Sequence, residues 1–321
     1  MQVRARFHAR QRPMHPSNEK QALLPGRSTV IANHNGTAPG FHLLSNRTEL
    51  YFLPGVPHEM LAMLDEYVIP ALLSRFPALP LQCQRIMSVF GLSEPEVESR
   101  INRNGLPEGV ALAFNVEFPM VLVKLRASGE TAQRLVDRAE LAVRKALDEH
   151  VVGIDSDTLA STTARFLATA GLTLALAESC TGGLIAKLLT DQPGSSTFLE
   201  RSVVSYANSA KVNALNVPQE TLDRHGAVSA ECAEAMVKGV HAAALTDISL
   251  AVTGIAGPGG GTVDKPVGTV YLAMTSAQGL RIERFNFSGN RDRIRLRTAC
   301  TALDWLRRLA MARLSGAGHE S

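Results

Sequence analysis

Apolar and polar residues follow strand and helix periods along most of the chain, and these periods divide it into three regions. The first region, residues 1–81, has two turn-rich segments at 35–40 and 53–57 around a strand-like run at 49–52. Apolar residues then recur at helical spacing, which predicts a helix from residue 57 to about residue 73.

The second region, residues 82–155, has the pattern of a small α+β unit. Its predicted elements are a strand at 83–89, a helix at 93–102, strands at 111–114 and 121–126, and a helix that begins near residue 131. That last helix has one apolar face, which includes Leu135, Ala139 and Val143, and a charged face typical of solvent contact.

The third region, residues 156–312, alternates helices and strands as an α/β domain does, and we expect a three-layer-type fold with a mixed sheet. Strands are predicted at 172–177, 201–206, 248–253, 267–276 and 280–287. Helices are predicted at 158–170, 183–190, 218–224, 229–244 and 290–310. The strand at 248–253 is too apolar for a solvent-exposed edge.

Composition fits a globular multidomain protein, because 45% of the 321 residues are hydrophobic and 20% are charged. A net charge of +3 gives no support for a general nucleic-acid binder. The four cysteines form no C-x-x-C pair, which argues against a zinc ribbon or a disulfide framework and favours reduced cysteines in the cytoplasm. No apolar run approaches the ~20 residues of a membrane span, so we expect no membrane partner.

The first candidate site is the turn at residues 178–183, which joins a predicted strand to a predicted helix. Free backbone N–H groups at such a helix start can hold an anion or a developing oxyanion. Ser179 and Thr181 add hydroxyl groups, and two glycines allow the backbone to approach a ligand closely. The same pattern also suits a helix N-cap without any catalytic function.

A second segment, residues 205–211, follows the next predicted strand and supplies proton acceptors. A serine hydroxyl is a weak nucleophile that needs a base. Neither segment contains a histidine, which leaves Lys211 and Tyr206. A desolvated lysine can have a pKa low enough to act as that base, although the pattern alone also fits a lysine in solvent.

Two more segments complete the set. Residues 252–261 leave a buried strand through a glycine-rich loop, and loops at the ends of neighbouring strands converge on one crevice. Six arginines crowd the turn into the last helix, and of these we expect Arg291 to be functional; they are Arg281, Arg284, Arg291, Arg293, Arg295 and Arg297.

These segments resemble the C-terminal domain of the competence/damage-inducible protein A (CinA) family, whose members include nicotinamide-nucleotide amidases. The resemblance covers about residues 157–310 and is carried by residues 178–183, 206–211, 225–229, 253–258 and 265–269. It implies Ser179 as nucleophile, Lys211 as base and Tyr206 as a residue that positions or relays the proton. The residues implied to contact substrate are Cys180, Thr181, Gly182, Gly183, Asn208, Thr253, Gly254 and Arg291.

The implied reaction converts nicotinamide mononucleotide and water to nicotinic acid mononucleotide and ammonia. The oxyanion would lie against N–H groups of residues 179–182, and the mechanism requires no metal and no cofactor. We also expect a homo-oligomer, with a dimer as the simplest form.

Residues 18–73 resemble the end of the family's N-terminal domain, which is similar to molybdopterin-binding folds and is associated with ADP-ribose pyrophosphatase activity. The chain begins in what looks like the middle of that domain, so the first region is expected to be a partial molybdopterin-binding-like α/β domain. Thr37 and Gly55 lie in segments that would line its site. The second region corresponds to the family's small linking domain, with a role as spacer or dimer contact.

Three alternatives remain open. The first region could supply a metal-dependent nucleotide pyrophosphatase, although the carboxylates that it needs are not evident there. The third region could be a nucleotide-binding module without chemistry. Cys180 could replace Ser179 as nucleophile, because a thiolate at a helix start is chemically attractive.

Overall fold

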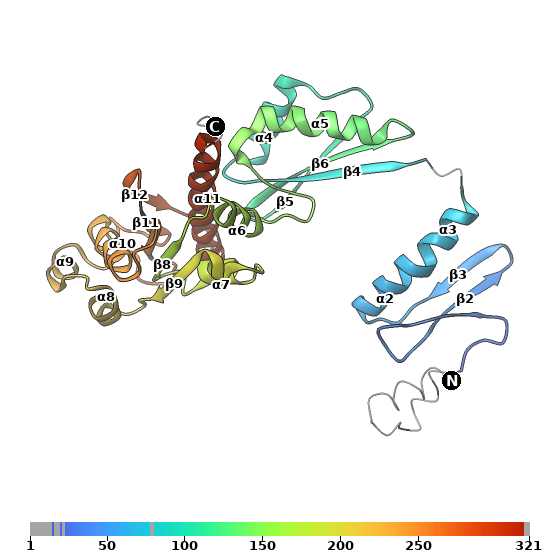
Figure 1. Ribbon diagram of the computed structural model, residues 1–321, viewed down its shortest axis with the longest axis horizontal. Helices are drawn as coiled ribbons and strands as arrows, with labels where there is room; N and C mark the ends of the chain where they lie inside the picture. Colours follow the sequence, from blue (N-terminus) through green and yellow to red (C-terminus); the bar gives the residue numbers. More distant parts are fainter. Residues whose placement is uncertain (1–14, 16–19, 21–22, 78–79, 318–321) are drawn as a thin grey trace. The chain divides into compact units, whose positions relative to one another are not determined.

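A computed structural model describes residues 15, 20, 23–77 and 80–317, and it divides the chain into two compact units, Met1–Pro80 and Leu81–Ser321 (Figure 1). The basic start at residues 1–12 and most of residues 18–22 lie outside the described residues. The division of the second unit into a linking domain and an amidase domain near residue 155 stays a prediction.

Over residues 23–77, the first unit is a three-stranded antiparallel sheet followed by a helical segment. Its strands, in the order β1-β2-β3, are Thr29–Ile31, Gly40–Ser45 and Thr48–Phe52. The helix predicted from residue 57 consists of α2 (Pro57–Met63), a π-helical turn (Leu64–Val68) and α3 (Ile69–Arg75). Pro70 cannot donate to the preceding turn, which gives a physical reason for the irregular stretch before it. The likeness to molybdopterin-binding folds stays a prediction.

The second unit begins with a four-stranded antiparallel sheet in the order β5-β6-β4-β7. Its strands are β4 (Gln82–Val89), β5 (Ala111–Glu117), β6 (Met120–Ser128) and β7 (Val151–Ile154), and its helices are α4 (Glu94–Asn104) and α5 (Ala132–Leu147). The predicted apolar face of α5 is confirmed, because Ala139, Val143 and Leu147 are buried against the sheet.

The rest of this unit is built on a five-stranded mixed sheet in the order β12-β11-β10-β8-β9. Strands β8 (Leu174–Glu178), β9 (Leu199–Val204) and β10 (Ile248–Gly254) run parallel, whereas β11 (Thr269–Ser276) and β12 (Gly279–Asn286) pair antiparallel. The α/β class and the mixed sheet are thus confirmed, and β10 is central, as its apolar sequence predicts.

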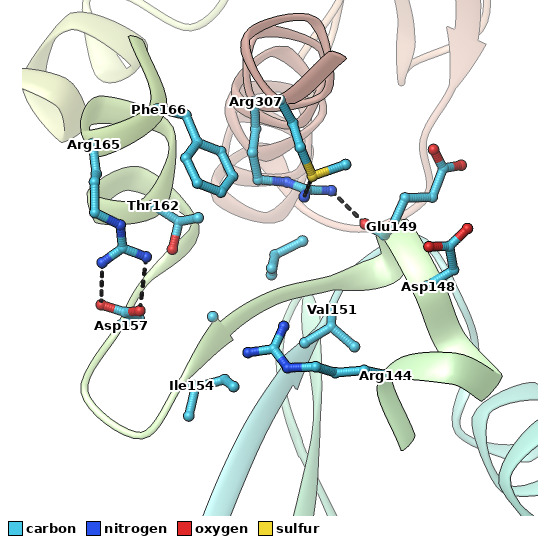
Figure 2. A pocket seen from close by; sticks show the side chains of 13 residues that line it. Arg144, Asp148, Glu149, Val151, Ile154, Asp157, Thr162, Arg165, Phe166 and Arg307 are labelled. Atoms are coloured by element: carbon cyan, nitrogen blue, oxygen red, sulfur yellow. Dashed lines mark hydrogen bonds and ion pairs between the residues drawn. The ribbon is translucent and has the colours of Figure 1, made fainter. Parts of the chain in front are cut away.

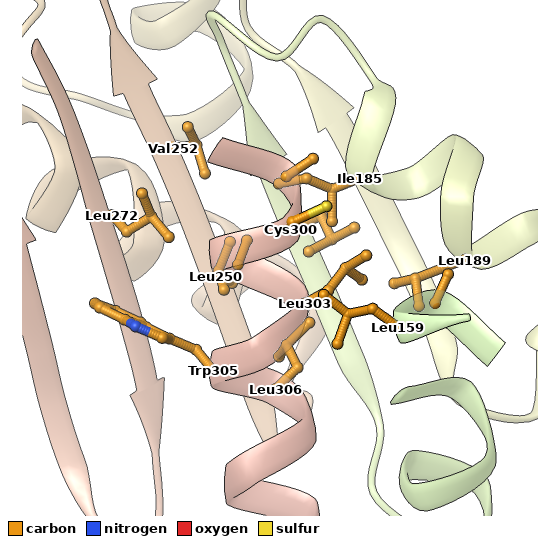
Figure 3. Close-up of a cluster of buried hydrophobic side chains, with 14 of the residues drawn as sticks. Leu159, Ile185, Leu189, Leu250, Val252, Leu272, Cys300, Leu303, Trp305 and Leu306 are labelled. Atoms are coloured by element: carbon orange, nitrogen blue, oxygen red, sulfur yellow. The ribbon is translucent and has the colours of Figure 1, made fainter. Parts of the chain in front are cut away.

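Helices cover both faces of this sheet because side chains alternate between the faces along each strand. Leu174 and Leu176 of β8 pack with α6 (Leu159–Thr169), α7 (Leu184–Thr190) and α11 (Arg291–Ala317), and Figure 3 shows Leu303 and Leu306 of α11 in this core. Ala175 and Ala177 face the other layer. That layer consists of α8 (Asn208–Leu215), α9 (Gln219–His225) and α10 (Ala230–Ala244).

The structure adds elements that the sequence pattern did not predict, namely β1, β2, β7 and α8. Strand β9 also ends at Val204, so Ser205 and Tyr206 lie beyond it and not within a strand at 201–206. Helix α8 is the most consequential omission. Its buried residues include Lys211 beside Leu215, and a charged residue on the inner face hides the apolar stripe by which a helix is recognised.

Candidate active site

The candidate site lies where three parallel strands end side by side. Ser179 follows β8, Ser205 follows β9, and Thr253 lies near the end of β10. The backbone hydrogen bonds of the sheet continue past the strand ends. Ser179 N–H donates to Val252 O (3.0 Å), and Ser205 N–H donates to Glu178 O (2.8 Å). The predicted convergence of these loops at one edge of the sheet is confirmed.

Lys211 lies at the centre of this arrangement. It is 1% exposed, and its Nζ donates to Ser179 Oγ (3.0 Å), to Ser205 O (2.8 Å) and, more weakly, to Tyr206 O (3.4 Å). Burial lowers the pKa of the Lys211 ammonium. The alternative of a surface lysine is therefore wrong, because the first turn of α8 turns this side chain inward.

The turn that carries Ser179 is held from both ends. Glu178 is fully buried, and its carboxylate accepts the N–H groups of Ile185 (3.1 Å) and Ala186 (2.8 Å) at the start of α7. Gly182 and Gly183 have φ values of +61° and +87°, which side-chain-bearing residues rarely adopt. Gly182 N–H donates to Ser179 O (3.0 Å). Ser179 and Gly182 have therefore committed their N–H groups within the protein.

A cavity of about 210 Å³ opens beside Ser179 and Lys211. Eight of the predicted site residues line it, namely Ser179, Cys180, Tyr206, Asn208, Lys211, Thr253, Gly254 and Arg291. Three others lie outside the lining, namely Thr181, Gly182 and Gly183. Those three shape the turn behind the nucleophile, and the lining instead includes Ala227, Val228 and Ala256, which the sequence did not single out.

The cavity wall is tied together by polar contacts from distant segments. Arg291 donates to Gly257 O (2.7 Å) and to the Tyr206 hydroxyl (2.7 Å), and thereby joins α11 to the glycine-rich loop. Thr253 Oγ donates to Ala227 O (2.6 Å). Among the described residues, no hydrogen bond joins the Tyr206 hydroxyl to Ser179 or Lys211, so a proton relay through Tyr206 stays a prediction.

Cys180 is next to the nucleophile candidate but in a different environment. It is 6% exposed, and burial raises the pKa of its thiol to about 12. A thiol with this pKa is almost entirely protonated near neutral pH, and the thiolate is the nucleophilic form. The raised pKa therefore argues against Cys180 as nucleophile, although Cys180 lines the same cavity.

Two supporting residues escaped the sequence analysis. Glu178 was quoted only as part of the turn, and Arg295 was counted among arginines in solvent. Arg295 donates to Thr181 O through Nη2 (2.7 Å) and Nε (3.2 Å), across 114 residues of sequence. The only sequence signal was its place one helical turn after Arg291, on the same face of α11.

Within the described ranges, no group of three or more His, Cys, Asp or Glu side chains is arranged to hold a metal ion. The described residues therefore offer no candidate metal site for the pyrophosphatase alternative. No helix in the described part of the chain is long and apolar enough to cross a membrane.

Comparison with known proteins identifies the family of the chain. Residues 156–310 match the model of the CinA C-terminal domain. A CinA-like protein of Syntrophotalea carbinolica is 53% identical over 96% of this chain and 74% of its own length. A second CinA-like protein, of Geobacter metallireducens, is 49% identical over 92% of this chain and 73% of its own length.

Solved structures of competence/damage-inducible proteins also match the chain. A CinA superfamily protein of Klebsiella pneumoniae is 35% identical and covers 48% of this chain and 96% of its own, with a TM-score of 0.46. The competence/damage-inducible protein CihA of Agrobacterium tumefaciens is 42% identical over 47% of this chain and 94% of its own, with a TM-score of 0.45. Because the chain is 53% identical to the Syntrophotalea carbinolica protein over 74% of that protein's length, it belongs to the CinA-like protein family.

Proposed function

We propose that the chain is a serine amidohydrolase that releases ammonia from nicotinamide mononucleotide. The observation that carries the proposal is the contact between the buried Lys211 Nζ and Ser179 Oγ at 3.0 Å. A lysine with a lowered pKa can act as base for a serine hydroxyl that it contacts, and the serine is then activated as a nucleophile.

The reaction would start with neutral Lys211. Its amine takes the Ser179 hydroxyl proton while Oγ bonds to the carboxamide carbon. The tetrahedral intermediate then collapses as the Lys211 ammonium returns a proton to the leaving nitrogen, which departs as ammonia. Water then attacks the resulting ester while Lys211 takes a proton from it. Lys211 returns this proton to Ser179 Oγ as the bond between Oγ and the acyl carbon breaks, and the acid product leaves as its carboxylate after losing a proton to solvent. The substrate's pyridinium withdraws electrons from the carboxamide and favours the first attack.

The oxyanion needs N–H donors that the protein has not already used. Ser179 and Gly182 donate to Val252 O and Ser179 O, and Thr181 lies outside the cavity lining, so the candidate in this turn is the N–H group of Cys180. This assignment narrows the oxyanion site that the sequence placed across residues 179–182. The rest of the cavity wall, with Arg291 and Tyr206, would hold the nucleotide part of the substrate.

The test is an ammonia-release assay with nicotinamide mononucleotide, free nicotinamide and asparagine side by side. We expect release from the mononucleotide, and roughly 10³-fold or greater loss of turnover in Ser179→Ala and Lys211→Met. The matched control is Lys187→Met, because Lys187 is 65% exposed on α7 and pairs with Asp191. Release from none of the three compounds would overturn the proposal.

A module that binds nucleotide without chemistry gives a different result. It would bind nicotinamide mononucleotide in both wild type and Ser179→Ala and release no ammonia in either. Calorimetric titration of the two proteins beside the assay separates that alternative from the amidohydrolase.

A further inference from the structure

A second cavity, of about 360 Å³, lies in the second unit between β7 and the helices α6 and α11 (Figure 2). It shares no lining residue with the cavity beside Ser179 within the described chain. Its volume falls within the range of small-molecule sites. Part of its wall is apolar, with Val151, Ile154 and Phe166.

Thr162 contributes an unpartnered hydroxyl to this wall. The residue is 5% exposed, and its Oγ has no hydrogen-bond partner among the described residues. Its neighbour Thr163 shows the ordinary alternative, since its hydroxyl donates to Leu159 O one turn back (2.7 Å). Because buried hydroxyl groups are nearly always hydrogen-bonded, Thr162 indicates a polar occupant of the cavity.

Arg307 contributes a second set of donors. It is 1% exposed, and Nε and Nη2 both donate to Asp304 Oδ1, at 3.1 and 2.7 Å. Nη2 also donates to Glu149 O. Within the described chain, Nη1 meets only the thioether of Met311, at 3.9 Å, and a thioether is a weak acceptor. The Nη1 hydrogens therefore lack a good acceptor at the cavity wall.

Three arginines and three carboxylates line the cavity, so the orientation of these side chains decides the local charge. Arg144 of α5 extends its guanidinium along the cavity in Figure 2, and it pairs with Glu140 through Nε (3.0 Å), which leaves its two terminal nitrogens for a ligand. Asp157 is engaged by both terminal nitrogens of Arg165, at 3.2 and 3.0 Å. The carboxylates of Asp148 and Glu149 point away from the cavity in the same view. Guanidinium groups bind carboxylate and phosphate oxygens well.

We propose that this cavity binds a small molecule with one carboxylate or phosphate group and a short apolar body. The oxyanion accepts hydrogen bonds from Arg307 Nη1, Thr162 Oγ and Arg144, and the apolar body packs on Phe166 and Ile154. This proposal is independent of the amidohydrolase proposal, because it uses none of the residues around Ser179.

The experiment is calorimetric titration of the full chain with inorganic phosphate and, separately, with butyrate. We expect saturable one-to-one binding of one of the two probes, which also tells phosphate from carboxylate recognition. Affinity should fall about 10-fold or more in Thr162→Val and in Arg144→Gln. It should be unchanged in Thr169→Val and Arg138→Gln, which alter exposed residues of the same two helices.

Binding should also persist in Ser179→Ala, which separates this cavity from the candidate active site. Saturation by neither probe would overturn the proposal, since the cavity would then hold only water. Binding that Thr162→Val and Arg144→Gln leave intact would overturn it as well, because the anion would then bind elsewhere on the surface.

Discussion

Lys211 combines burial with contact to a nucleophile, and this combination predicts a pH dependence. Burial disfavours the ammonium and lowers the pKa of Lys211, so the neutral amine is populated at lower pH than in a lysine in solvent. We expect kcat/KM to rise with pH until Lys211 is deprotonated and then to level off. Steady-state kinetics across about pH 6 to 9 check this. A kcat/KM that falls as pH rises over that range would contradict Lys211 as the base.

Cys180 provides a second prediction at the residue scale. Because burial raises the pKa of its thiol to about 12, Cys180→Ala should keep turnover within roughly threefold of wild type. Cys300→Ala is the matched control, since burial raises the pKa of Cys300 to about 12 as well and Cys300 does not line the cavity. If Cys180→Ala alone abolished ammonia release, Cys180 and not Ser179 would be the nucleophile.

Individual site residues were predictable where chemistry and local sequence agree. Ser179 follows the buried strand β8, Thr253 lies near the end of the buried strand β10, and Lys211 lies in the helix after β9. Loops after neighbouring parallel strands meet at one edge of the sheet. Arg295 was not predictable in this way. Its partner is a backbone carbonyl 114 residues away, and a carbonyl has no sequence signature.

At the scale of elements, α11 stabilises the turn between β8 and α7. Arg295→Met removes both hydrogen bonds to Thr181 O, and the turn is then free to shift the Ser179 hydroxyl. We expect kcat to fall by about 10- to 100-fold with little change in KM, because substrate still meets an intact cavity wall. Steady-state kinetics with a circular dichroism check of folding measure this.

The control for that variant is Arg297→Met. Arg297 lies on the same helix, and its guanidinium carbon is 5.9 Å from the centroid of the Phe287 ring. Its kcat should match that of wild type. An equal loss of kcat in both variants would show a general effect on α11 in place of a specific contact with the turn.

The elements themselves were mostly predictable, and the failures have a physical cause. Regular apolar periods gave the helices that became α5 and α10 and the central strand β10. Helix α8 was not predicted because its inner face carries Lys211, whose burial depends on acceptors in the segments after β8 and β9. A short strand such as β7, with four residues, gives too few alternations to recognise.

At the scale of the whole molecule, the two units have separate cores. Among its described residues, the first unit has three buried apolar side chains, Ile31, Met63 and Val68, whereas the three large clusters all lie after residue 81. We expect residues 81–321 alone to fold and to release ammonia with kcat/KM within roughly threefold of the full chain. Thermal unfolding and the ammonia assay on this shorter protein test it. Loss of activity with folding intact would assign the first unit a part in catalysis.

Helix α11 has one more consequence, for communication within the second unit. Its first residue, Arg291, lines the cavity beside Ser179, and Arg307 lines the cavity beside β7. Sixteen residues of α-helix separate them by about 24 Å. If α11 moves as one body on the sheet, binding in one cavity shifts the residues of α11 that line the other, without any relay of side chains. Binding in one cavity would then displace the wall of the other along the axis of α11.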